Sequence, residues 1–498
     1  IRGISPFGTL TLLDGHRMTP NGTTGAAPDP NVIPTIALER IEIVADGASA
    51  IYGSDAVVGV ANLILRRKVQ GAEASVHYGS ADSYTDRQLG ALWGTSWSGG
   101  NVMLAFENGQ HSNLSGTDRD FFKSDLRDRG GSDYRVQQCF PGNIVIPPTG
   151  TPTTTYPIPA SGPVTAATLV ANNANPNKCD NIKYIDLIPE QNHDAAAMTF
   201  DHAFGDKLSV FAQGYWARRE YIFTNPTAAQ NLTVPNTNAF YVRPAGAVAG
   251  TSETVQYSFA NDFGPNHPVF ANRGFAETYN VLGGVAYNLP ADWRAEASIS
   301  YGHDFERNNT TQINTAALTA ALASSNPATA LNPFGTSTNS AAVLDSLMTQ
   351  VSIAPGRSIQ RTWELKADGP LFHLPGGDVR AAVGVGELYL SLLGGQITGP
   401  VTAPTGGMNV FSSRTVKSAF AEVAVPLVGE ANAVTGIRRL DLSLAGRREN
   451  YSDFGATSHP KIGLNWTIVD GLMAHASYGT SFRAPGLSQL KSIAAPGI

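Results

Sequence analysis

Few polar side chains in this sequence have the types and spacing that catalysis or metal binding requires. The 498 residues contain no Gly-x-Ser-x-Gly, no phosphate-binding Gly-Lys-Ser/Thr and no His-Glu-x-x-His motif. Those patterns mark hydrolases, nucleotide-binding proteins and zinc enzymes, respectively. His16 and His267 lie in segments expected to be loops, without a second ligand nearby, so a solvated polar role fits them better than metal ligation. The sequence therefore predicts a protein that binds rather than catalyses, and no cofactor.

The chain has two cysteines, Cys139 and Cys179. They bracket a stretch, 136–177, that is rich in proline and contains no Asp, Glu, Lys or Arg. Two cysteines that close one polar loop predict a disulfide formed in an oxidising compartment, worth about 3 to 4 kcal/mol from loop entropy. A pair of free thiols is the alternative, because sequence alone does not fix pairing.

Alternating polar and apolar residues predict that most of the chain is β-structure. In the segment 292–305, Ala297 and Ile299 fall on one face, whereas Glu296 and Ser298 fall on the other. Similar alternation recurs in runs of about ten residues, the length that a tilted membrane strand needs. The thirteen runs are 71–80, 87–97, 101–111, 191–203, 207–221, 274–289, 292–306, 359–371, 378–390, 414–425, 438–450, 457–468 and 471–483.

The connections between these runs alternate in length. Short gaps such as Gly205-Asp206 and Pro290-Ala291 are followed by long segments, at about 112–190, 222–273, 307–358 and 391–413. Short turns at one end and long loops at the other are typical of transmembrane barrels, where the long loops are extracellular. A soluble sandwich has no reason to keep its long loops at one end.

Composition fits a membrane protein built from strands. The balance of 34 basic to 40 acidic residues gives a net charge of -6, which argues against a nucleic-acid partner because no basic surplus exists to neutralise phosphates. No apolar run approaches the roughly 20 residues of a membrane-spanning helix, but in a membrane strand only alternate residues face lipid. A secreted or surface all-β binding protein, or an adhesin, has a similar composition and stays open as the alternative.

The stretch 9–68 carries four motifs in a fixed order. They are Leu13-Asp14-Gly15, then Glu39-Arg40-Ile41-Glu42-Ile43, then the segment from Gly47 to Gly53, then Gly59-Val60-Ala61-Asn62 running to Arg66-Arg67-Lys68. In this order they closely resemble the second half of the plug domain of TonB-dependent receptors, the outer-membrane transporters of Gram-negative bacteria. Segments 417–422, 447–463 and 478–485 resemble barrel strands of the same family. A soluble α/β segment with ordinary turn glycines is the alternative for the first stretch.

The resemblance implies an all-β transmembrane barrel, here about 13 of the family's 22 antiparallel strands, with an α+β plug fragment inside. We expect residues 1–69 to be the C-terminal half of the plug and 70–498 the N-terminal part of the barrel, so that the chain is a fragment without its TonB box. The family further implies a monomer in the cell outer membrane, surrounded by outer-membrane lipid. Such a receptor imports a scarce ligand, a ferric siderophore or an oligosaccharide, with energy from the TonB-ExbB-ExbD complex.

The same resemblance points to individual residues. In the family, the plug loop after the Leu-Asp-Gly turn contributes to ligand contact, which here indicates His16, Arg17, Asn21 and Asn31; a solvated loop is the alternative for each. Arg40 and Glu42 lie on the plug strand whose charges pair with the barrel wall in the family. Partners that can separate would let the plug move.

The segment 222–272 is unusually aromatic and has few charges. Its rings could stack on a neutral ligand such as a sugar, although packing of a long loop on itself is the favoured interpretation. The aromatic residues are Phe223, Phe240, Tyr241, Tyr257, Phe259, Phe263 and Phe270.

Overall fold

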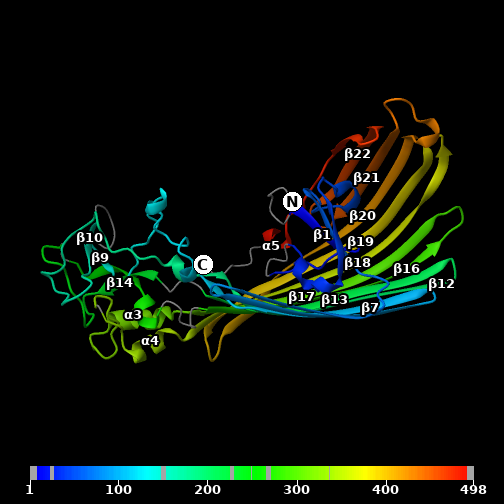
Figure 1. Cartoon of the computed structure of the whole chain (residues 1–498). Coiled ribbons are helices and arrows are strands. Elements are labelled where there is room, and N and C mark those ends of the chain that lie inside the picture. Colours follow the sequence, from blue (N-terminus) through cyan, green and yellow to red (C-terminus); the bar gives the residue numbers. More distant parts are fainter. Residues whose placement is uncertain are drawn as a thin grey trace.

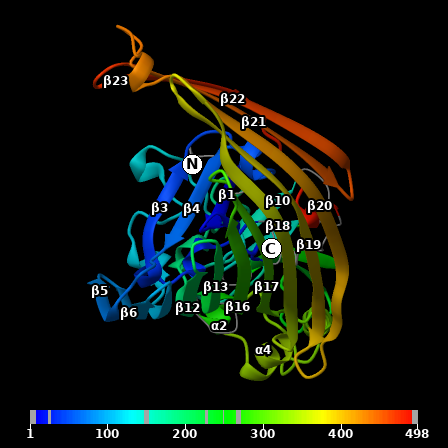
Figure 2. The same cartoon turned by 90° about the vertical axis from the view of Figure 1, so that its right-hand side faces the viewer.

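One antiparallel sheet of thirteen strands makes up most of the protein. The computed structural model describes residues 8–22, 27–146, 153–224, 229–247, 250–264, 271–335 and 337–490, so His267 and Phe270 lie outside the described residues. Each strand of the sheet pairs with its neighbours in chain order, and the sheet curves into an open trough (Figures 1 and 2). The thirteen predicted strands are confirmed, because each overlaps one strand of this sheet. The strands are β5 (Gly71–Ala81), β6 (Tyr84–Trp97), β7 (Gly100–His111), β12 (Glu190–Phe204), β13 (Leu208–Thr224), β16 (Ala271–Asn288), β17 (Arg294–Gln312), β18 (Gln350–Leu374), β19 (Gly377–Pro400), β20 (Thr405–Val428), β21 (Arg439–Tyr451), β22 (Gly455–Val469) and β23 (Leu472–Gly479).

The two faces of the sheet differ in polarity, as the alternation predicts. On the convex face Ile299 is 68% exposed, Trp363 46% and Ile462 48%. On the concave face the neighbouring Ser298 and Gln360 are buried. The exposed face of the sheet thus carries large apolar side chains, whereas its other face is covered. This arrangement indicates an apolar environment outside the trough. No helix of the described residues is long and apolar enough to span a membrane.

The N-terminal residues form a small unit, the plug, inside the trough (Figure 2). Its strands have the order β2-β1-β4-β3, with β1 parallel to β4. On one side, Leu63 and Leu65 of the plug share an apolar core with Leu92, Met103 and Tyr215 of the sheet. The plug elements are β1 (Thr9–Leu13), β2 (His16–Arg17), η2 (Pro30–Val32), η3 (Thr35–Ala37), β3 (Leu38–Val44), α1 (Ser49–Tyr52) and β4 (Gly59–Leu65).

At one end of the sheet the connections fold together into a separate body, the loop subdomain (described residues 112–146, 153–189, 229–247, 250–264, 313–335 and 337–349), at the left of Figure 1. A four-stranded sheet of order β10-β9-β15-β14 and two helices enclose its core. Tyr257, Phe259 and Phe334 are among its fully buried side chains. The elements in these loops are β8 (Leu114–Ser115), η4 (Gly116–Asp118), η5 (Arg127–Arg129), β9 (Asn143–Ile146), β10 (Thr154–Pro157), η6 (Ile182–Tyr184), β11 (Asp186–Ile188), β14 (Ala229–Pro235), β15 (Ser252–Ser258), α2 (Ala260–Phe263), α3 (Thr315–Ala323) and α4 (Ala341–Leu347).

One of the long loops expected from the sequence does not exist. Residues 391–413 continue strands β19 and β20, which are joined by a turn at 401–404. Glycines hide the alternation here, because Gly394 and Gly395 form a bulge in the ladder and Gly406 and Gly407 carry no side chain. The expected loop at 307–358 is shorter for a similar reason, since β17 runs to Gln312 and β18 begins at Gln350. Two short elements complete the description. The 3-10 helix η8 (Glu430–Asn432) lies in the connection between β20 and β21, and α5 (Leu487–Leu490) follows β23.

Candidate functional site: the plug and its contacts with the sheet

The glycine-rich segment of the plug docks on strands β21 and β22 through hydrogen bonds. The carboxylate of Glu449 accepts a bond from the backbone amide of Ser54 (3.3 Å) and another from Arg447 Nε (2.8 Å). The guanidinium of Arg447 also donates to the carbonyl of Ile51 at the end of α1 (3.0 Å). Glu449 is almost fully buried, so its charge is held by donors from both the plug and the wall.

Position 53 of that segment accepts only a glycine. Its φ is +82°, in the region that side chains disfavour, and a Cβ atom there would lie 2.2 Å from Glu449 Oε1. Next to it, Lys461 of β22 donates to the carbonyl of Gly47 (2.9 Å) and lies 3.1 Å from Asp46. The motif from Gly47 to Gly53 therefore brings plug backbone close to charged wall residues.

Of the residues expected at the ligand, Arg17 lies inside the plug. Its guanidinium contacts Asp55 (3.2 Å) and the carbonyls of Tyr52 (2.9 Å) and Ser54 (2.8 Å). These bonds hold the turn that presents the Ser54 amide to Glu449. Arg17 thus positions the docking segment and points away from the loop subdomain.

His16 also lies far from the long-loop end. Its ring stacks against Phe211 at 6.4 Å between centroids, and Phe211 is close to the short turn that joins β12 and β13. Burial and, to a smaller extent, the positive charge of Lys366 lower the pKa of His16 to about 4. His16 is therefore neutral at pH 7 and is placed near the short-turn end of the trough.

Asn21 and Asn31 belong to the plug apex (described residues 20–22 and 27–33), the part of the plug nearest the long-loop end. The amide nitrogen of Asn21 donates to Thr278 Oγ1 and to Asp304 Oδ1 (3.1 Å), and its oxygen accepts from the Asp29 amide (2.9 Å). The side chain of Asn31 is exposed. Asn21 therefore fastens the apex to the wall, and Asn31 is free to meet a ligand.

A cavity of about 360 Å³ opens beside the apex. A second wall contact borders it, because Arg219 of β13 pairs with Asp29 at 2.8 Å. Four amide side chains supply half of the other polar residues around the space, which can therefore donate and accept hydrogen bonds. The lining includes Asn21, Asn31, Gln88, Gln191 and His193.

Arg40 and Glu42 bond to each other rather than to the wall in the described part of the chain. The guanidinium lies 2.7 Å from Glu42 and 2.9 Å from Glu39, and all three side chains are about half exposed. Strand β3 is an edge of the plug sheet (Figure 2), and no described residue of the thirteen strands lies within ion-pair distance of Arg40 or Glu42. The pairing with the wall that the resemblance implied is made at other positions.

Arg67 is one of those positions. It lies 2.5 Å from Asp201 of β12 and 3.2 Å from Asp14 of the plug, so it bridges the two parts. Arg66, its neighbour in the basic run that ends the fourth motif, also pairs with a wall acid, Glu73 of β5 (2.5 Å). The sequence showed the basic run, but only the fold shows which carboxylate each arginine meets. Glu107 of β7 accepts a hydrogen bond from the backbone amide of Thr35 in the plug (2.9 Å). Neither Glu107 nor Asp304 was predicted as a contact with the plug, because a buried acid inside an alternating strand looks like any polar inward residue.

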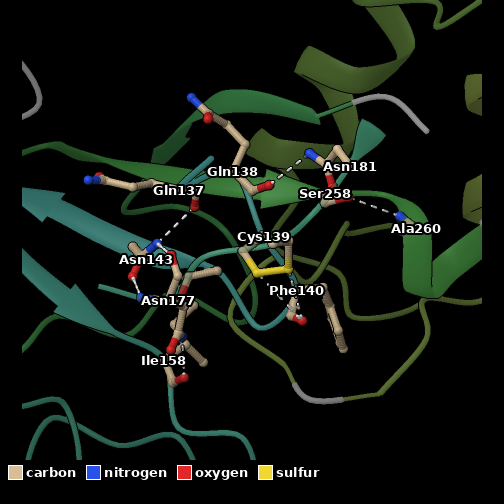
Figure 3. The surroundings of a disulfide bond; sticks show 12 residues. Gln137, Gln138, Cys139, Phe140, Asn143, Ile158, Asn177, Asn181, Ser258 and Ala260 are labelled. Atoms are coloured by element: carbon tan, nitrogen blue, oxygen red, sulfur yellow. Dashed lines mark hydrogen bonds between the residues drawn. A yellow bond between two sulfur atoms is a disulfide. The ribbon is translucent and has the colours of Figure 1, made fainter. Parts of the chain in front are cut away.

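Cys139 and Cys179 form a disulfide in the loop subdomain (Figure 3). The adjacent Asn143 fixes two strands of the loop, donating to the Gln137 carbonyl (2.8 Å) and accepting from the Asn177 amide (2.8 Å). The carbonyl of Cys139 accepts a hydrogen bond from Ser258 at the end of β15. The disulfide therefore closes the first long loop on itself, and the hydrogen bond from Ser258 joins this loop to the second.

The chemistry available at these places is binding and charge pairing. Among the described residues, no three His, Cys, Asp or Glu side chains gather in a way that could hold a metal ion. The aromatic side chains of the second long loop are mostly turned inward, since Tyr257 and Phe259 have no exposed surface. They pack as the core of the loop subdomain.

Comparison with known families matches both parts of the structure. Residues 1–60 match the family described as TonB-dependent Receptor Plug Domain. Residues 227–497 match the family described as TonB dependent receptor-like, beta-barrel. The second match covers more than half of the chain and the strands β16 to β23.

Solved structures share the fold at low sequence identity. The ferric enterobactin receptor (PfeA) from Pseudomonas aeruginosa is 16% identical with a TM-score of 0.58, and the match covers 99% of this chain and 56% of that one. The siderophore receptor PirA from Acinetobacter baumannii is 14% identical (TM-score 0.54, 98% and 55% covered). The ferric citrate transporter FecA is 12% identical (TM-score 0.55, 98% and 57% covered). The chain thus spans a little over half the length of these proteins.

Proposed function

Because the chain belongs to the TonB-dependent receptor family, we propose that it is the plug and part of the barrel of an outer-membrane receptor that imports a ferric siderophore. The family consists of receptors and transporters of the Gram-negative outer membrane rather than enzymes. To this family membership the proposal adds three points about this protein: the class of its ligand, its dependence on the TonB-ExbB-ExbD complex and the absence of a catalytic step.

The observation that carries the proposal is the asymmetric attachment of the plug. Towards β6, β7, β12 and β13 it packs through an apolar core, to which ion pairs such as Arg67 with Asp201 are added. Towards β16 to β22 it is held by polar contacts, among them Asn21 with Asp304 and Ser54 with Glu449. Hydrogen bonds of this kind contribute about 0.5 to 1.5 kcal/mol each because water can replace them. A pull on the plug would therefore open the polar side first, next to the apical cavity.

The ligand class rests on the apical cavity and on what the solved relatives bind. A space of about 360 Å³ is large enough for a small ligand. Its amide groups and Arg219 suit a ligand rich in oxygen atoms, as ferric siderophores are. The names of the relatives mention ferric enterobactin and ferric citrate, which supports the same class for this protein.

The two alternatives have less support. An oligosaccharide would use exposed rings, but Tyr257 and Phe259 are in the core of the loop subdomain. A secreted binding protein would bury the apolar side chains that this sheet leaves open at Ile299, Trp363 and Ile462.

Uptake by whole cells tests the proposal. Iron-starved cells that carry the receptor should accumulate radioactive iron from one of a panel of ferric siderophores, and the same cells without TonB should not. Equal uptake with and without TonB would overturn the transport mechanism. Recovery of the receptor as a detergent-free soluble monomer would overturn the membrane assignment.

The apex provides the residue-level test. Replacing Asn31 by Ala should weaken ligand binding by about three- to tenfold, as expected for one lost hydrogen bond. The exposed Asn175 of the loop subdomain is the matched control, and Asn175→Ala should leave affinity unchanged. An unchanged affinity for Asn31→Ala would remove that residue from the site.

A further inference from the structure

Three side chains on the convex face form a layered arrangement. Register places Arg361 of β18 directly between Tyr301 of β17 and Tyr389 of β19. The guanidinium carbon lies 5.8 Å from the Tyr301 ring centre and 5.7 Å from that of Tyr389. The two rings hold the cation in place while its remaining donors face outward.

A second arginine stands on the same face of the same strand. Arg357 is four residues before Arg361, which places the two about 13 Å apart at the usual strand rise. Both arginines are exposed, and neither has a carboxylate within ion-pair distance among the described residues. Of the acids on this face, Glu277 pairs with Arg218 (3.0 Å), and Glu387 stands opposite Lys417 in the ladder.

The arginines lie just above an apolar belt. Two residues further along β18 comes Trp363 and then Leu365, both about half exposed. On β17 the residue next to Tyr301 on this face is Ile299, and on β16 Val281 pairs with Tyr301. From the short-turn end to the long-loop end, apolar side chains therefore come first, then the two tyrosines with Arg361 between them, then Arg357. In a membrane protein this order marks the passage from hydrocarbon to headgroups, and the long loops place it at the outer leaflet.

We propose that Arg357 and Arg361, with Tyr301 and Tyr389, form a binding surface for the phosphate groups of an anionic lipid in the outer leaflet. The inference rests on the proposed membrane location and is independent of the imported ligand. Planar guanidinium groups bind phosphate through paired hydrogen bonds, and the tyrosine rings belong at the headgroup level. The occupant is a lipid rather than free phosphate, because the apolar belt below the arginines would hold its acyl chains.

The experiment measures lipid retention by the receptor purified from outer membranes in detergent. Native mass spectrometry compares phosphatidic acid with diacylglycerol of the same chains, two lipids that differ only in the phosphate. Phosphatidic acid should be retained, and the double variant Arg357→Gln/Arg361→Gln should lose about tenfold in affinity, as for one to two charge-assisted bonds. Arg439→Gln, at the exposed short-turn end of β21, is the matched control and should bind like the unaltered protein.

Several outcomes would overturn the inference. They are equal retention of the two lipids by the unaltered protein, unchanged retention by the double variant, and competition by inorganic phosphate at the concentration of the lipid. The first comparison needs no variant and stays decisive if the double variant fails to fold. Arg361→Lys keeps the charge but loses the planar stacking, so it should fall between the two. Ferric siderophore uptake is measured in parallel. An unaltered receptor that takes up the siderophore but does not retain phosphatidic acid refutes this inference alone, whereas a receptor that never enters membranes refutes the proposed function.

Discussion

The buried carboxylate of Glu449 on β21 accepts a hydrogen bond from the backbone amide of Ser54 in the plug, over a separation of 395 residues. The same carboxylate accepts a bond from the Tyr451 hydroxyl (2.6 Å) and pairs with Arg447. One acid thus joins the wall strand to the glycine-rich segment of the plug. The attachment depends on charge at a buried position, which makes it strong when complete and weak when one partner is removed.

Replacing Glu449 by Gln should loosen the plug on this side. The amide keeps an acceptor for Ser54 but leaves the Arg447 guanidinium without its counter-charge, which costs about 3 kcal/mol for a buried pair. Hydrogen–deuterium exchange of the Ser54 amide should accelerate by about a hundredfold. Glu430→Gln, at an exposed connection, is the control. An unchanged exchange rate at Ser54 would contradict the role of Glu449.

A comparison of two plug glycines distinguishes the energetic cost of a strained backbone from the cost of a steric clash. Gly15 and Gly53 have nearly equal φ values, +83° and +82°, but a Cβ on Gly15 meets nothing within 4 Å, whereas one on Gly53 would collide with Glu449. Gly15→Ala should therefore lower the free energy of unfolding by about 1 kcal/mol, the cost of the left-handed backbone alone. Gly53→Ala should cost about 2 to 4 kcal/mol because a clash is added. Urea unfolding of both variants measures the difference, and equal losses would contradict the docked geometry.

The disulfide should stabilise the loop subdomain and not the large sheet. Cys139 and Cys179 are 40 residues apart. In the variant Cys139→Ala/Cys179→Ala the free energy of unfolding should fall by about 3 to 4 kcal/mol, because the unfolded loop is no longer restricted by the bridge. Amide exchange should rise at Ile144 and Tyr257, which lie in the subdomain core, but not at Ser298 of β17. A reductant should affect the native protein and have no effect on the variant. Faster exchange at Ser298 would show that the two parts unfold together.

His16 should make the stability of the plug depend on pH. Burial holds the pKa of His16 at about 4 in the folded protein, below the ordinary value of 6.5. Between these values the unfolded chain binds a proton that the folded protein does not, so the free energy of unfolding falls as pH drops from about 6.5 to 4. His16→Gln should reduce this slope, and His475→Gln, at an exposed position of β23, should not. Urea titrations across this range measure the slopes, and identical slopes for the native protein and His16→Gln would contradict the burial of a neutral ring.

The sequence was sufficient for the repeating features of the fold. Alternation at Ala297, Ser298 and Ile299 gave both the strand and the face that each residue occupies, because successive side chains of a strand point to opposite sides. It failed where glycines interrupt the alternation, at Gly394 and Gly395, and a loop was expected in place of two long strands.

For the candidate site, the sequence determined which segments carry chemistry and which side chains are available. It placed the glycine-rich segment and the basic run in the plug, and it singled out the two cysteines. Only the tertiary structure decided which partners they meet: Arg67 finds Asp201, Ser54 finds Glu449, and Arg40 stays with Glu42 on its own strand. These pairs join residues tens to hundreds of positions apart, and their contacts depend on the curvature and register of the sheet, which no local pattern of residues encodes.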